Sequence, residues 1–280
     1  MLPKINLNDF EFCDIMLYKV FERGVDMGKY NSSIYRVRPL MECIEKDYSA
    51  FLSVLSLVGI GLLGEPSACR YKGIACSEMK LKPTKQHLLA LVKLMATREK
   101  HGKIDVTGQK RLDLFFGTPD VRRAAYEKAK AELELKYDSL TDRCRLPWYV
   151  FEGFTNPDIF IEGEDYVIVC EGKWTEPHIT TTTKYLSLAG EYRNQMVRHI
   201  QGALNYTNKK VYAFYIVDDE CGYTEDLNKK SFDRQLGLET IQLDDIEKEK
   251  ISSAFYGYTT WQSINKKLPQ IVFQSKNEIK

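Results

Sequence analysis

The segment from Asn156 to Lys173 constrains the fold of this chain more than any other. Two short apolar runs, Ile159–Ile161 and Tyr166–Cys170, flank a turn at Gly163-Glu164, and the second run leads into Glu-Gly-Lys. Short runs rich in β-branched and aromatic residues, bounded by turn residues, are typical of a β-hairpin. The sequence therefore predicts two antiparallel strands with charged side chains at their open end.

Side-chain alternation in this hairpin places three charged residues on one face. With the turn centred on Gly163-Glu164, Asp158 lies opposite Val169 and shares a face with Glu171 and Lys173. Diagonal neighbours in such a pair are about 7–8 Å apart, close enough for two carboxylates to converge on one hard cation. The alternative is an ordinary hairpin with a surface ion pair. However, Glu171 and Lys173 end a run typical of a central strand, where an idle charged pair would be costly.

These residues resemble a known signature. Pro157-Asp158 followed by Glu171-Gly172-Lys173 is similar to the motif of the PD-(D/E)XK nucleases, the restriction-endonuclease-like superfamily. The resemblance implies an α/β fold, in which a mixed central sheet is flanked by helices. It also implies that Asp158 and Glu171 hold Mg²⁺, with the Gly172 carbonyl as a further ligand and Mn²⁺ as a substitute. Lys173 would then orient the attacking water.

Members of this superfamily often add a glutamine from the helix that follows the lysine. Apolar spacing predicts that helix over about 183–205, and Arg193-Asn194-Gln195 fits the Arg-x-Gln-like context, which implies that Gln195 joins the catalytic site. His178 and His199 are weaker candidates, since a lone histidine is more often a bystander. Some members add a glutamate from an earlier element, and the sequence leaves the choice open among Glu127, Glu132, Glu134 and Glu152.

The rest of the chain is expected to divide near residue 117. Residues 1–117 are predicted to be mostly helical, as a support or a DNA-reading unit, and residues 118–280 to form the nuclease-like domain. Helices are predicted over 10–24, 38–63, 85–100, 118–136 and 244–255, with another starting near Thr260. Further strands are predicted at Trp148–Phe151 and Val211–Val217.

Basic side chains gather before the motif. Residues 78–147 carry sixteen basic and ten acidic side chains, which suits a polyanion-binding surface but is also ordinary for solvated helices. The residues expected to contact nucleic-acid phosphates are Lys110, Arg111, Arg122, Arg123, Arg193 and Arg198.

Composition excludes several other classes. Apolar residues make up 44% and charged residues 28% of the 280, which is globular usage rather than disorder or coiled coil. The longest apolar run, residues 50–64, is shorter than the roughly 20 residues that span a bilayer, so we expect buried core and no membrane association. Seven cysteines without a CxxC pair support neither a disulfide framework nor a zinc site, and no signal peptide is evident, so a cytoplasmic location is expected.

The sequence thus predicts a magnesium-dependent hydrolase that cuts phosphodiester bonds, most specifically a restriction-type endonuclease. DNA is favoured over RNA as its partner by the resemblance alone. The alternative is a catalytically inactive module of nuclease fold that serves as a nucleic-acid or protein binding platform. Many members of the superfamily cut as dimers, so a homodimer is also considered, although no surface in the sequence identifies an interface.

Overall fold

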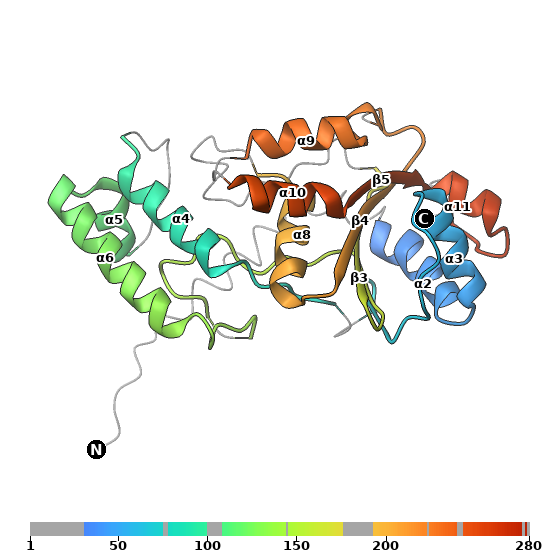
Figure 1. The fold of residues 1–280 in the computed structure, drawn as a ribbon, viewed down its shortest axis with the longest axis horizontal. Helices are drawn as coiled ribbons and strands as arrows, with labels where there is room; N and C mark the ends of the chain where they lie inside the picture. The colour runs from blue at the N-terminus through green and yellow to red at the C-terminus, as the bar shows by residue number, and fades with distance from the viewer. Residues whose placement is uncertain are drawn as a thin grey trace, which may run out of the picture.

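The computed structural model describes residues 31–74, 78–99, 108–143, 145–175, 193–222, 224–239, 243–275 and 278. A five-stranded mixed sheet in these residues has helices on both faces, as Figure 1 shows. The expected α/β class is therefore confirmed. The predicted helix over 10–24 lies outside the described residues.

The strands follow one another across the sheet in chain order. They are β1 (Ala68–Tyr71), β2 (Ile159–Glu162), β3 (Tyr166–Gly172), β4 (Lys210–Val217) and β5 (Phe255–Thr260). The pairs β1–β2 and β2–β3 are antiparallel, whereas β3–β4 and β4–β5 are parallel. The three strands predicted for β2, β3 and β4 are confirmed. Strands β1 and β5 were not predicted, because neither contains a run of apolar residues.

The hairpin forms, but its predicted register was wrong by two positions. Phe160 pairs with Val169 and Glu162 with Val167, so the turn spans residues 163–166 and is closed by a 3.0 Å bond from the Gly163 amide to the Tyr166 carbonyl. Continuing this register places Asp158 opposite Glu171 instead of Val169. Because the shift is even, every side chain keeps its predicted face.

Two helical layers cover the sheet. On one face, α2 (Arg38–Ile44), α3 (Tyr48–Leu57) and α11 (Trp261–Lys267) pack in one apolar cluster with Ile168 and Cys170, so Cys170 is buried filler as expected. The helices of the other face are α8 (Gln195–Tyr206), α9 (Lys229–Gly237) and α10 (Asp245–Ala254). These pack in a second cluster with Val167 and Val169. The face that carries Asp158 and Glu171 is therefore the face under α8.

The single helix predicted over 38–63 is wrong, since the chain breaks it into α2 and α3. Asp47 starts the second helix, because its carboxylate accepts a 2.8 Å bond from the Ser49 amide. The helix ends at Leu57, and the chain then turns at Gly59, whose φ of 72° favours glycine. The apolar run still forms core, with Phe51 and Leu55 buried. No helix among the described residues is long and apolar enough to cross a membrane.

A third apolar cluster holds the helices at the far left of Figure 1 together. They are α4 (Lys85–Thr97), α5 (Gln109–Phe116) and α6 (Pro119–Lys136), which we call the helical unit. The strand predicted at Trp148–Phe151 is wrong, because Tyr149, Val150 and Phe151 bury their side chains in this cluster instead of pairing with the sheet. Residues before 117 thus supply the strand β1 and two helices that cover the sheet, α2 and α3. They also supply α4 and α5 of the helical unit.

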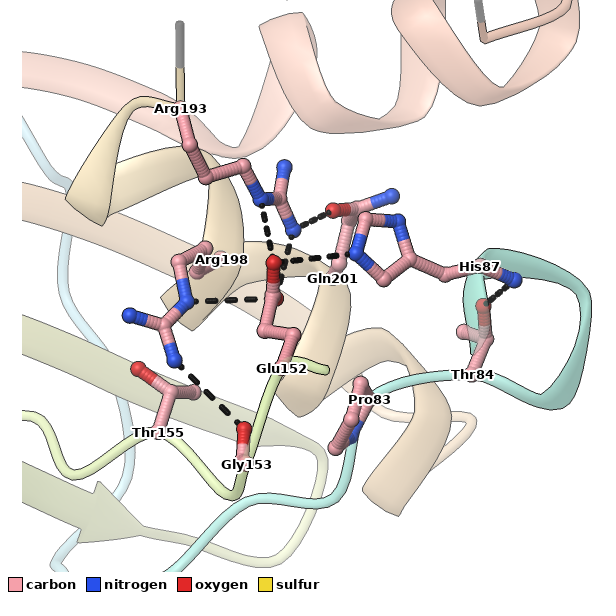
Figure 2. Close-up of a pocket in the computed structure, with 9 residues that line it drawn as sticks. All are labelled: Pro83, Thr84, His87, Glu152, Gly153, Thr155, Arg193, Arg198 and Gln201. Atoms are coloured by element: carbon pink, nitrogen blue, oxygen red, sulfur yellow. Dashed lines mark hydrogen bonds and ion pairs between the residues drawn. The ribbon is translucent and has the colours of Figure 1, made fainter. Parts of the chain in front are cut away.

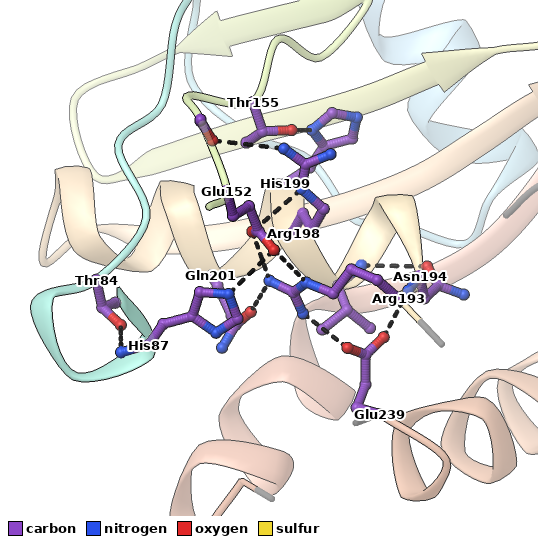
Figure 3. A network of polar contacts seen from close by, with 12 residues as sticks. Thr84, His87, Glu152, Thr155, Arg193, Asn194, Arg198, His199, Gln201 and Glu239 are labelled. Carbon is purple, nitrogen blue, oxygen red and sulfur yellow. Dashed lines mark hydrogen bonds and ion pairs between the residues drawn. The ribbon is translucent and has the colours of Figure 1, made fainter. Parts of the chain in front are cut away.

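A buried ionic network joins the helical unit to α8 (Figures 2 and 3). Glu152 accepts two 3.0 Å bonds from Arg193 and one of 3.1 Å from Arg198, and His87 of α4 lies 3.1 Å away. Arg193 also bonds Glu239 at 2.8 Å. Burial alone would raise the pKa of Glu152, but these positive charges, Arg193 above all, hold it well below its ordinary value. The network therefore fixes the chain just before α8.

The first turn of α8 is fixed by its N-cap. The Asn194 side chain accepts bonds from the amides of Met196 at 2.8 Å and Val197 at 3.2 Å, and its amide group donates to Gln235 at 2.7 Å. Asn194 and its neighbour Arg193 are both almost fully buried. The residue that follows them, Gln195, is consequently held at the first position of the helix, above the end of β3.

Candidate active site

Three of the side chains predicted to act together meet where β3 ends. The Lys173 ammonium lies 2.9 Å from Glu171 Oε1 and 3.0 Å from Gln195 Oε1. Gln195 Nε2 in turn donates to the same Glu171 oxygen at 2.7 Å. The three groups come from the strand, the residue after it and the first turn of α8. They form a closed triangle of hydrogen bonds that fixes the ammonium in place.

Asp158 faces this triangle from the neighbouring strand. Its Oδ2 accepts a 2.8 Å bond from the Gly172 amide, and its Oδ1 lies 2.7 Å from the ammonium of Lys72. Asp158 and Glu171 are almost fully buried. Lys72 was not predicted, because it follows β1, a strand that the sequence did not reveal.

The two carboxylates respond oppositely to their surroundings. Burial, followed by the negative charge of Glu171, raises the pKa of Asp158 to about 7. Burial also opposes the ionisation of Glu171, but the charge of Lys173 and the hydrogen bond from His199 outweigh it and lower its pKa. Two adjacent buried carboxylates of this kind favour any cation that can sit between them.

His199 supports Glu171 from the second turn of α8. Its Nε2 lies 3.0 Å from Glu171 Oε2, and its Nδ1 lies 2.7 Å from the Thr155 hydroxyl. Burial lowers the pKa of His199, which keeps the ring neutral at pH 7. A carboxylate can only accept, so Nε2 carries the proton and Nδ1 accepts from Thr155. The sequence left His199 as a weak candidate, whereas the structure places its ring against Glu171, where it can orient the carboxylate.

None of the four glutamates considered as an additional site residue bonds Asp158 or Glu171. Glu127, Glu132 and Glu134 lie on α6, where Glu134 pairs with Lys85 and Glu132 lies 3.9 Å from Lys110. Glu152 belongs to the buried network already described. His178 lies outside the described residues.

The basic residues predicted to contact phosphates occupy two kinds of position. Arg193 and Arg198 belong to the buried network, and Arg193 is only 2% exposed. Arg111 donates to the Trp148 carbonyl at 2.8 Å. Arg122 donates to the Met95 carbonyl at 3.1 Å and so binds the end of α4. These four therefore support the fold.

Lys110 and Arg123 are the two of the six that stay at the surface of the helical unit. Within the described part of the chain, the Arg123 guanidinium forms an exposed pair with Asp120 at 3.0 Å, and the Lys110 ammonium lies 3.9 Å from Glu132. Exposed pairs of this kind contribute little and are easily exchanged for another anion. These two side chains are accordingly available to a phosphate.

The donor set suits a hard divalent cation. Asp158, Glu171 and the Gly172 carbonyl offer oxygen atoms only, which is the choice of Mg²⁺ and Mn²⁺. A Cβ at Gly172 would lie 3.0 Å from the Trp261 ring and 3.1 Å from Val37, so the tight packing of this backbone favours glycine. Among the residues that the structure describes, no three His, Cys, Asp or Glu side chains surround one metal position. A cation here would rest on the two carboxylates and the Gly172 carbonyl, with water completing its shell.

Comparisons with known proteins return no match: no family model, no curated protein and no solved structure resembles this chain.

Proposed function

We propose that this chain is a divalent-metal-dependent nuclease that hydrolyses phosphodiester bonds in DNA, with a restriction-endonuclease-like core. The observation that carries the proposal is the triangle of Glu171, Lys173 and Gln195, with Asp158 directly across the hairpin. An ammonium held beside two buried carboxylates and an amide is costly to fold. A role in phosphate-ester hydrolysis would explain why the protein keeps this costly arrangement. The reaction needs a metal cation, an oriented water and a further positive charge beside the phosphate.

The arrangement of elements supports the same conclusion. An antiparallel hairpin carries the acidic residues, α8 crosses one face of the sheet, and β4 returns parallel to β3. This order agrees with the core that the PD-(D/E)XK resemblance implies. The helices α2, α3 and α11 on the opposite face give the strands a second apolar layer and so keep the hairpin rigid.

Each residue then has a definite task. Asp158, Glu171 and the Gly172 carbonyl would hold the cation, which supplies positive charge that polarises the phosphate and lowers the pKa of water. Lys173 orients the attacking water and offsets the negative charge that builds on the phosphate, and Gln195 keeps the ammonium aimed. Water adds to phosphorus as one P–O ester bond breaks, which leaves a phosphomonoester and a free hydroxyl.

The helical unit suggests why the activity would be of the restriction type. Lys110 and Arg123 lie at its surface, and phosphate contacts of this kind position a duplex. The unit is joined to α8 by the buried network, so nucleic acid bound there would sit in a fixed relation to the site. We accordingly propose a cytoplasmic endonuclease in which this unit contacts DNA.

One observation favours the inactive binding module as the second candidate. Every carboxylate oxygen of Asp158 and Glu171 already has a donor from the chain. A site satisfied in this way needs no metal to be stable. The two candidates differ in whether a divalent cation binds and whether a phosphodiester bond breaks.

A substrate panel separates the two candidates. Supercoiled plasmid, linear duplex, single-stranded DNA and RNA would be incubated with the protein in Mg²⁺, in Mn²⁺ and in chelator. We expect metal-dependent cutting of duplex DNA, with discrete fragments if the enzyme reads sequence. Metal-dependent cutting of RNA alone would reject the DNA assignment. No cutting of any substrate, together with no metal binding by calorimetry, would leave the binding module.

Replacing His199 with alanine should weaken metal binding on the order of 10- to 100-fold, the usual effect of losing a group that orients a metal ligand. The reason is that Glu171 Oε2 loses its donor and the side chain is free to turn. Calorimetry with Mn²⁺ measures the affinity, and H199Q, which can still donate to Glu171, should recover part of it. Unchanged affinity in H199A would show that Glu171 needs no such support.

A further inference from the structure

Lys72 occupies the side of Asp158 on which a cation would be held. We propose that Lys72 is a built-in counter-ion that competes with the divalent metal for Asp158, so that the metal binds only when this lysine leaves. The inference rests on the proposed function, since it assumes that Asp158 and Glu171 hold a metal. It assigns a second lysine to the site, one that the superfamily resemblance did not point to.

The backbone holds Lys72 in register with Asp158. The Lys72 amide donates to the Asp158 carbonyl at 2.9 Å, which continues the β1–β2 pairing by one residue. The ammonium of the same residue then lies 2.7 Å from Asp158 Oδ1. The other oxygen, Oδ2, accepts from the Gly172 amide. A metal ion bound through Oδ1 would therefore take the place that the Lys72 ammonium now holds.

The positive charge of Lys72 also opposes a metal ion at Asp158. A lysine is positively charged at pH 7, and the Lys72 ammonium lies 2.7 Å from Asp158 Oδ1. Lys72 beside Asp158 and Lys173 beside Glu171 thus place one ammonium against each carboxylate. A divalent ion at Asp158 Oδ1 would lie within a few ångströms of the Lys72 ammonium, and like charges at that range repel strongly inside a protein. The two cations exclude one another.

The Lys72 side chain is exposed enough to move away from Asp158. It keeps 25% of its surface exposed, whereas Asp158 keeps 5%, so the ammonium can swing outward while the carboxylate stays. The exposed carboxylate of Glu78 already acts on Lys72 electrostatically and would receive it. Asn156 bonds that carboxylate at 3.3 Å and holds it near the end of the hairpin.

The chain offers a matched control. Lys209 pairs with Glu162 at 2.7 Å, the same distance as between Lys72 and Asp158. The Lys209 side chain is 30% exposed, against 25% for Lys72. Glu162 points to the same face of the sheet as Asp158, but it lies next to the turn of the hairpin. The variant K209M therefore removes one charge and one ion pair of the same kind without touching the site.

Calorimetric titration with Mn²⁺ of the full chain tests the proposal. The proteins compared would be wild type, K72M, K72Q and K209M, with circular dichroism to confirm that each is folded. We expect K72M to bind Mn²⁺ at least about tenfold more tightly than wild type, and K209M to match wild type. K72Q keeps a hydrogen bond to Asp158 but not the charge, so it should also bind more tightly and covers the case in which K72M fails to fold.

Two results would overturn the inference, and they are distinguishable. If wild type binds Mn²⁺ and the Lys72 variants bind it equally or more weakly, Lys72 does not compete, and the proposed nuclease function stands. If neither wild type nor a Lys72 variant binds Mn²⁺, the metal site itself is refuted and the proposed function falls with it.

Discussion

Replacing Lys173 with alanine should lower the rate of metal-dependent DNA cleavage by on the order of 10²- to 10³-fold, the usual loss when one group that stabilises transition-state charge is removed. The ammonium lies 2.9 Å from Glu171 and 3.0 Å from Gln195, so it is held in one place before substrate arrives. Alanine removes the charge and leaves both carboxylates. The chemical step should therefore slow while the metal still binds.

Single-turnover cleavage of a duplex, with enzyme in excess, measures that step. K209M is the control, because it removes a lysine from an ion pair of the same hairpin at a distance from the site. The prediction is a large fall in the cleavage rate for K173A alone, with Mn²⁺ binding no weaker than wild type in both variants. A K173A protein that cleaves within a few-fold of wild type would show that this lysine takes no part in the reaction.

The largest loss of stability is expected at Arg193. Its guanidinium bonds Glu152 twice at 3.0 Å and Glu239 at 2.8 Å, and it is 2% exposed. Replacement by methionine keeps much of the volume but leaves buried carboxylates without their main partner. Breaking a buried pair in this way costs about 3–5 kcal/mol. Equilibrium urea unfolding of R193M against wild type measures the difference.

Arg123 supplies the matching surface substitution. Its pair with Asp120 is exposed and lies within one turn of α6, so R123M should leave the unfolding midpoint unchanged. Because the network fixes the residues that precede α8, R193M should also lower the cleavage rate through Gln195. An R193M protein as stable as wild type would mean that Glu152 and Glu239 are satisfied without the arginine.

The hairpin shows how far a sequence of this kind can be interpreted. Alternation placed Asp158, Glu171 and Lys173 on one face, and they lie there because side chains in a strand point to alternate sides. The register was wrong because the turn contains two more residues than the tight turn assumed. A register shift of one residue would have placed Asp158 on the opposite face of the sheet. The predicted face is correct because the actual turn is longer than the assumed turn by an even number of residues.

Contacts between residues that are far apart in the sequence could not be predicted from the sequence. Lys72 reaches Asp158 through β1, a strand of four residues without an apolar run. The prediction of Arg193 as a phosphate contact is wrong, because a charged residue beside a catalytic motif gives no sign of whether its partners are phosphates or buried carboxylates. Its partners Glu152 and Glu239 lie 41 and 46 residues away along the chain, and only the fold brings them together.

Asp158 completes the proposed metal site together with Glu171, so the proposed nuclease activity depends on its carboxylate. The most direct measurement is cleavage of a supercoiled plasmid in Mg²⁺ by wild type and by D158N, each with and without chelator. We expect wild type to convert the plasmid to open-circular or linear DNA only in free Mg²⁺, and D158N to leave it supercoiled. Cleavage by D158N at the wild-type rate, or by wild type in chelator, would contradict it.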